Sequence, residues 1–104
     1  MLPMLYILDG RLPVPAPDRR AWGHWLVSAS RRVTQATLAH AAVVTTVFLG
    51  LAHGTAHDGT PLLWETVVTR DGRPHPTRVH TATWDEAEAA HARIVQVLRR
   101  AYGG

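Results

Sequence analysis

Residues 43–51, which read VVTTVFLGL, are the stretch that decides the fold of this chain. Valine, threonine and phenylalanine have branched or aromatic side chains, which fit a pleated sheet better than a helix. The stretch therefore predicts a β-strand. Gly50, near its end, indicates that the strand gives way to a loop, which we expect over residues 52–61 because they are rich in turn formers.

Residues 62–69, which read LLWETVVT, have the same strand-forming character. The Asp71-Gly72 pair that follows is typical of a tight hairpin turn, and it predicts a returning strand over residues 77–81. Pro74 and Pro76 lack the backbone N–H that a central strand needs. We therefore expect this last strand to lie at a sheet edge or to start late.

Two helices and one short strand are expected on either side of these three strands. Apolar side chains at three- and four-residue steps predict a helix over residues 19–35, with Asp18 as its N-cap. Thr83 and Glu86 form a capping-box pattern at the start of a second helix, which we expect to run to Arg100. Residues 5–8 predict a short strand, and the prolines of residues 11–17 predict an extended connector.

The resulting order is strand, helix, three strands and helix, within one domain over residues 1–104. This order predicts an α+β fold, in which a small antiparallel sheet of about four strands has two helices packed on it.

Apolar side chains point to both faces of the strands expected at residues 43–51 and 62–69. A sheet with one solvated face would instead alternate apolar with polar residues. Two helices cannot easily cover both faces of the sheet. Self-association is therefore the simplest way to cover the second face. We therefore expect a homodimer or a higher oligomer.

The composition excludes several classes of protein. The chain has no cysteine, which rules out disulfide frameworks, cysteine-based zinc sites and thiol nucleophiles. Its net charge is +3, but the arginines come as scattered pairs, so we do not expect nucleic-acid binding. The longest apolar run, residues 41–52, is too short to span a bilayer. We expect a soluble, cytoplasmic protein that does not bind membranes.

A small group of aromatic, charged and hydroxyl side chains forms the candidate ligand site. Trp64 has an indole that either packs in the core or stacks on a nucleobase. Glu65 sits in an apolar strand and needs a partner, such as an arginine or a threonine hydroxyl. A histidine on the apolar stripe of the second helix is either a hydrogen-bonded core residue or a ligand. The candidate residues are Thr45, Thr46, His53, Trp64, Glu65, Arg78 and His91.

A metal site is the alternative interpretation of the loop histidines. His53, His57 and Asp58 carry the groups that zinc prefers, and a complete site needs a further ligand, such as His91 or Glu65. Surface histidines in a loop are the simpler interpretation, so we expect no metal and no cofactor. The only two serines lie in the first predicted helix, and no phosphate-binding or nucleophile motif occurs. We therefore expect no catalytic residues.

The sequence resembles a family of short proteins encoded by tailed phages and prophages. The most specific part of the resemblance is TVFLGL at residues 46–51 with His53, followed by PLLWET at residues 61–66. It extends from YILDG at residues 6–10 to the TW pair at residues 83–84 and to His91. Ala52 stands where we expect an acidic residue, which argues against a catalytic role for His53.

The resemblance implies a phage origin but no established activity. Small phage proteins often counter host defence, and some are compact oligomers that sequester cyclic nucleotides or ADP-ribose derivatives. Our first hypothesis is a non-enzymatic binder, or sponge, of such a nucleotide-derived signal. A metal-dependent phosphoesterase that degrades these signals and a protein-binding inhibitor of a host defence enzyme are the alternatives.

Overall fold

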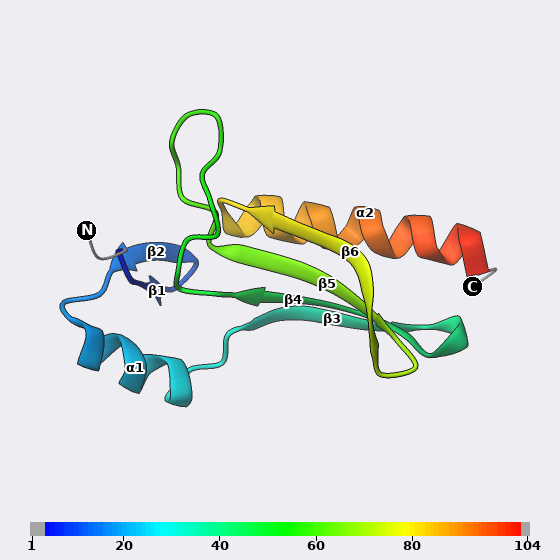
Figure 1. Ribbon diagram of the computed structural model, residues 1–104, viewed down its shortest axis with the longest axis horizontal. Coiled ribbons are helices and arrows are strands. Elements are labelled where there is room, and N and C mark those ends of the chain that lie inside the picture. The colour runs from blue at the N-terminus through cyan, green and yellow to red at the C-terminus, as the bar shows by residue number, and fades with distance from the viewer. Residues whose placement is uncertain (1–3, 103–104) are drawn as a thin grey trace.

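Strand β4 (Ala42–Phe48) pairs along its whole length with strand β5 (Trp64–Arg70), as the strand-forming residues predict. The computed structural model describes residues 4–102. Strand β6 (Arg73–Thr81) flanks β5, and β3 (Arg32–Leu38) flanks β4, giving an antiparallel sheet in the order β3-β4-β5-β6. The expected edge position of the proline-bearing strand is confirmed, although β6 starts directly after the turn (Figure 1).

Helix α2 (Trp84–Tyr102) lies across one face of this sheet (Figure 1). Its first turn is held as the capping box predicts, because the Thr83 hydroxyl accepts from the Glu86 N–H at 3.1 Å. The Glu86 carboxylate in turn accepts from the Ala82 N–H at 3.1 Å. Acidic residues begin the helix and arginines end it, which suits the helix dipole.

The N-terminal part forms a separate small unit at one end of the sheet. It consists of the hairpin β1 (Tyr6–Asp9) and β2 (Leu12–Pro15), followed by helix α1 (Arg19–Ser28). Asp18 caps α1 as predicted, since its carboxylate accepts from the Ala21 N–H at 2.7 Å.

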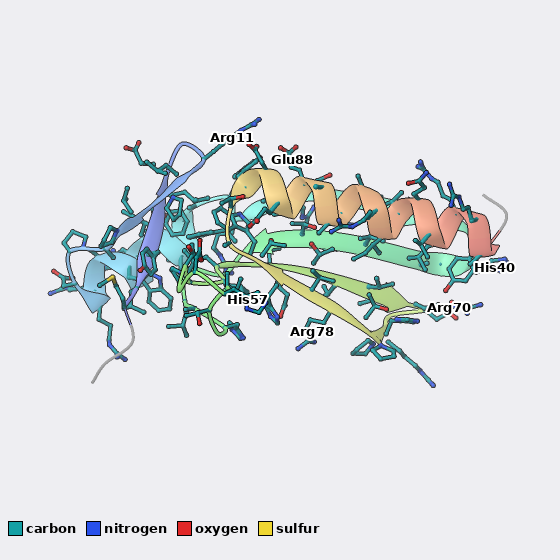
Figure 2. The ribbon with its side chains drawn as sticks, turned by 90° about the horizontal axis from the view of Figure 1, so that it is seen from above. Arg11, His40, His57, Arg70, Arg78 and Glu88 are labelled. Atoms are coloured by element: carbon teal, nitrogen blue, oxygen red, sulfur yellow. The ribbon has the colours of Figure 1, made fainter. Side chains whose placement is uncertain are left out.

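Trp25 of α1 meets Phe48 of β4 edge-on, with ring centroids 5.6 Å apart. Arg11 of the hairpin lies over the ring of Trp84 and 3.7 Å from the Glu88 carboxylate, and Figure 2 shows this pair beside the first turns of α2. The N-terminal unit thus packs against the end of the sheet and does not cover either of its faces.

The α+β class and the four-stranded antiparallel sheet with two helices are confirmed, but two boundaries differ from the prediction. The first helix ends at Ser28 instead of residue 35, because β-branched residues of the segment that follows pair with β4 as strand β3. The proline-rich connector contains β2, which pairs with β1. The structure therefore has two more strands than the predicted order, and only α2 covers a face of the larger sheet.

The second face of the four-stranded sheet carries no helix within the described part of the chain (Figure 1). This open face presents half-buried valines and threonines from the two central strands, together with one carboxylate: Val43, Thr45, Val47, Glu65, Val67 and Thr69. None of the helices within residues 4–102, including the short 3-10 helix η1 (Ala39–Ala41), is long and apolar enough to cross a bilayer.

Gly50 joins the N-terminal unit to the sheet. Its carbonyl oxygen accepts from the Tyr6 N–H at 2.8 Å and from the indole N–H of Trp22 at 3.2 Å. Its φ of +74° is one that other residues rarely adopt, and an added Cβ would come within 2.9 Å of the Tyr6 carbonyl oxygen. Only glycine fits this junction without displacing backbone.

Replacing Gly50 by alanine should lower the free energy of unfolding by about 3 kcal/mol, combining left-handed backbone strain with a clash against main chain. Gly59→Ala is the matched control, since Gly59 also has a positive φ but nothing lies within 4 Å of an added Cβ. It should cost about 1 kcal/mol. Chemical denaturation of both variants measures the difference, and equal losses would contradict the role of Gly50 as a junction.

Candidate functional site

The alternation of side chains along β4 and β5 divides the candidate residues between the two faces of the sheet. Thr46 and Trp64 point toward α2 and are fully buried, and His91 of the helix is largely buried beside them. Thr45 and Glu65 belong to the open face, which Arg78 of β6 shares, because Arg78 pairs with Val67. Only the open-face group remains within reach of a ligand.

The buried group forms a polar row between the sheet and α2. Thr46 and Thr66 are paired across the strands, with their hydroxyl oxygens 2.7 Å apart, and the Thr46 hydroxyl lies 3.1 Å from His91 Nδ1. These bonds satisfy polar atoms that would otherwise be costly in a dry interior. His91 is 8% exposed, and burial lowers its pKa from the ordinary value of 6.5. The row is a structural element of the core.

Trp64 is a core side chain in this structure. It is 0% exposed and meets Phe48 at an angle, with ring centroids 5.1 Å apart. Its indole N–H is buried without a hydrogen-bond partner among the described residues. Of the two interpretations of Trp64, packing in the core is the one that matches its position. Its indole face is covered and cannot stack on a nucleobase.

On the open face, Glu65 is the centre of a charged cluster. Its Oε2 lies 2.9 Å from His80 Nε2 and 3.7 Å from Arg78 Nε. The Glu65 side chain is 16% exposed, whereas the arginine side chain is 57% exposed. The carboxylate is thus partly withdrawn from solvent while the guanidinium next to it stays accessible.

His53 extends this cluster from the segment that joins β4 to β5. Its ring stacks on that of His80, with centroids 5.1 Å apart and planes inclined by 8°. The two stacked imidazoles form a flat, polar surface beside edge strand β6, with the Glu65 carboxylate at the Nε2 edge of the His80 ring. We call Glu65, His80, Arg78 and His53 the open-face cluster.

The segment over residues 49–63, here called the arm, extends the β4–β5 hairpin beyond the sheet (Figure 1). Its two sides are joined by backbone hydrogen bonds, including His53 N–H to the Leu62 carbonyl at 3.0 Å and Ala56 N–H to the Thr60 carbonyl at 2.8 Å. At its tip, the Asp58 carboxylate accepts from the Thr60 N–H at 2.9 Å, and hydrogen bonding to Thr60 lowers the pKa of Asp58. The predicted loop therefore has a fixed, ribbon-like form.

A hollow of about 300 Å³ lies where the arm, the end of β6 and the first half of α2 meet. His80 and Thr81 line it from β6, and Arg93 lines it from α2. The Thr81 hydroxyl is buried there without a hydrogen-bond partner in the described part of the chain. The open-face cluster thus borders this hollow through His80, and Arg93 places a second cation at the wall of the hollow. The full lining is Ala56, Leu62, His80, Thr81, Ala82, Glu86, Ala89 and Arg93.

The residues of the alternative metal site do not come together. His53, His57 and Asp58 lie on the arm, whereas His91 is buried on the other face of the sheet beneath α2. Within residues 4–102, no three histidine, aspartate or glutamate side chains are grouped so as to hold a metal ion. Figure 2 shows His57 and Arg78 along the same side of the molecule, beside β6.

Two residues of this region were not predicted from the sequence. His80 is the direct cross-strand partner of Glu65, and Arg93 reaches the hollow from α2. The available signal for His80 was its strand position opposite a buried carboxylate, but the pairing depends on a bulge between β5 and β6. Nothing in the sequence indicated Arg93.

Comparisons of the chain with protein-family models, with curated proteins and with solved structures gave no match. The interpretation of the site therefore depends on its geometry and chemistry.

The buried position of His91 predicts a pH-dependent stability. Because burial lowers the pKa of His91 in the folded state, the unfolded chain binds more protons near pH 6. The free energy of unfolding should fall as the pH drops below about 6.5, toward the lower folded-state pKa. Denaturation curves between pH 8 and pH 5 measure this loss.

His91→Gln keeps a polar side chain in the row but removes the titrating group, so it should flatten this part of the pH profile. His24→Gln is the matched control, because His24 is exposed on α1. An unchanged profile in His91→Gln would contradict the assignment.

Proposed function

We propose that the protein is a non-enzymatic binder of a nucleotide-derived anion, such as a cyclic nucleotide or an ADP-ribose derivative. The observation that carries the proposal is the open-face cluster, in which Glu65 holds His80 and Arg78 while His53 stacks on His80. The ligand would lie against this cluster and extend toward the hollow at the arm.

The chemistry of the cluster matches the parts of a nucleotide. The exposed guanidinium of Arg78 can bind a phosphate through two parallel hydrogen bonds. The stacked rings of His53 and His80 offer a flat surface for a base. Both contacts of Glu65 use Oε2, so its other carboxylate oxygen can accept from a base amino group or a ribose hydroxyl.

The size of the hollow supports a small ligand. Its volume of about 300 Å³ lies at the lower end of the range for small-molecule sites. Arg93 of α2 adds a second cation at the wall of this hollow. A ligand with two phosphates, or with a phosphate and a base, would engage both arginines.

Sequestration is favoured over hydrolysis by the residues available near the cluster. The chain has no cysteine, and its two serines, Ser28 and Ser30, are in α1 and just after it. The hydroxyl that lines the hollow next to His80 belongs to Thr81, and it is buried, so it is not placed to attack a bound phosphate. Binding without turnover requires only the contacts described above.

We further propose that a second copy of the chain covers the open face of the sheet. The valines Val43, Val47 and Val67 lie there half-buried on neighbouring strands. An isologous dimer would bury these side chains and turn the cluster of each copy into the wall of a closed cleft. Closing the cleft would also strengthen the contacts between Arg78 and an anion, because water is excluded.

The resemblance to short tailed-phage proteins supplies the biological setting of this proposal. A phage protein that sequesters a nucleotide-derived immune signal in the host cytoplasm would counter bacterial defence without any catalytic step.

Binding of a nucleotide is tested by calorimetric titration with a panel of cyclic nucleotides and ADP-ribose isomers. At least one member should bind, and Arg78→Ala should weaken its binding about tenfold or more, since a charge-assisted hydrogen bond is lost. Glu65→Gln should weaken binding as well, because it releases His80. Arg20→Ala, which removes an exposed arginine from α1, is the matched control and should leave binding unchanged.

The outcomes separate the three functional classes. A binder returns intact nucleotide when the complex is denatured by heat, whereas a phosphoesterase returns products and loses activity in a chelator. A protein-binding inhibitor binds no member of the panel, and that result would overturn the proposal.

The dimer is tested by light scattering coupled to size-exclusion chromatography. The wild-type chain of 11.4 kDa should elute with about twice that mass at micromolar concentration. Val67→Glu places a charge on the open face and should give the monomer. Val97→Glu is the control, because Val97 is 61% exposed on α2 and away from that face. A monomeric wild-type protein would refute the proposed cover.

A further inference from the structure

The β5–β6 hairpin contains a like-charge pair that stability alone does not explain. Arg70 and Arg73 are directly opposite each other at the end of the two strands. Like charges in this arrangement repel and destabilise a hairpin. Among residues 4–102, neither arginine has a carboxylate within ion-pair distance, although Arg70 lies over the Tyr102 ring at 5.0 Å from its centroid.

Both arginines line a hollow of about 420 Å³ on this hairpin. The other walls come from the turn and from the start of β6: Asp71, Pro74, His75 and Pro76. Figure 2 shows Arg70 near the C-terminal end of α2, whereas Arg11 lies beside the first turns of that helix. The hollow shares no lining residue with the open-face cluster.

His75 has a fixed hydrogen-bonding role in this hollow. Its Nδ1 accepts from the Thr77 N–H at 3.1 Å, so in the neutral ring the proton resides on Nε2. That N–H is a donor whose direction is set by the backbone. The hollow thus combines two guanidinium groups with one oriented imidazole donor.

The prolines give the hollow a rigid backbone. The pairing of β6 with β5 shifts in register between Val67 and Thr69, so the segment around Pro74 and Pro76 bulges from the ladder. Proline fixes φ and donates no hydrogen bond, which limits the conformations that this bulge can adopt. The backbone of this segment therefore loses little entropy when a ligand binds.

From this arrangement we propose that the β5–β6 hairpin is a second binding site, for a phosphate ester that carries free hydroxyl groups. Arg70 and Arg73 bind the phosphate, and the His75 Nε2–H donates to one of its oxygens. Asp71 lies in the same hollow and repels a bare phosphate, but its carboxylate accepts from a hydroxyl. A ribose phosphate, either in a free nucleotide or in an RNA strand, has both groups.

Ribose 5-phosphate is the probe, and the readout is the set of backbone amide shifts in ¹H–¹⁵N NMR spectra between residues 70 and 77, where Pro74 and Pro76 give no signal. These shifts should move on titration, whereas ribose without phosphate should leave them in place. Arg73→Ala should weaken binding about tenfold or more. The same variant should keep or raise the melting temperature, because it removes the repulsion with Arg70. Arg20→Ala is the charge-matched control.

An RNA octamer at equal phosphate concentration distinguishes the two sources of the ligand. Tighter binding at the same amides identifies an RNA strand, and binding of the monomer alone identifies a free nucleotide. Arg78→Ala should not alter either result, which separates this site from the open-face cluster. The proposal is overturned if ribose 5-phosphate leaves residues 70–77 unperturbed, or if Arg73→Ala binds it as the wild type does.

Discussion

The register between β4 and β5 is the constraint on which the rest of the structure depends. It places three cross-strand pairs in successive rows beneath α2: Phe48 with Trp64, Thr46 with Thr66, and Val44 with Val68. The helix meets these rows with Ala87, His91 and Val95, which recur every four residues on one helical face. Two apolar clusters therefore lie on either side of one polar row. A shift of one residue would send every member of these rows to the other face.

The same register determines what the molecule offers to a ligand. Because successive side chains alternate between faces, burying Trp64 and Thr66 beneath the helix places Glu65 on the open side. The carboxylate is then opposite His80 and diagonal to Arg78, so its partners are supplied by strand β6 alone. Core packing and the composition of the candidate site are thus two results of one pairing.

The sequence predicted the elements that depend on neighbouring residues. It did not predict the elements that depend on pairing between distant strands. The Thr83–Glu86 cap, the Asp18 cap and the Asp71-Gly72 turn depend on neighbours within a few residues, and all three are present. The first part of β3, residues 32–35, was predicted as helix, since the apolar periodicity of the preceding segment continues to Val33. Only its pairing with β4 makes residues 32–38 a strand.

For the site, alternation alone would have separated Thr45 from Thr46 and Trp64 from Glu65. Counting back from the hairpin turn without a bulge makes Arg78 the partner of Glu65. The bulge near Pro74 and Pro76 shifts that pairing to His80, and no rule for counting residues anticipates its size.

The arm is a part of the chain whose side chains can vary while the fold is kept. The two sides of the arm are joined mainly by hydrogen bonds between backbone amides and carbonyls. The side chains of His53 and His57 therefore contribute little to holding the arm together. Substitutions at these exposed positions would alter the surface of the arm while its backbone keeps the same path. Related chains that share this scaffold are therefore free to diverge in what they recognise, with the variation concentrated on a short protruding segment.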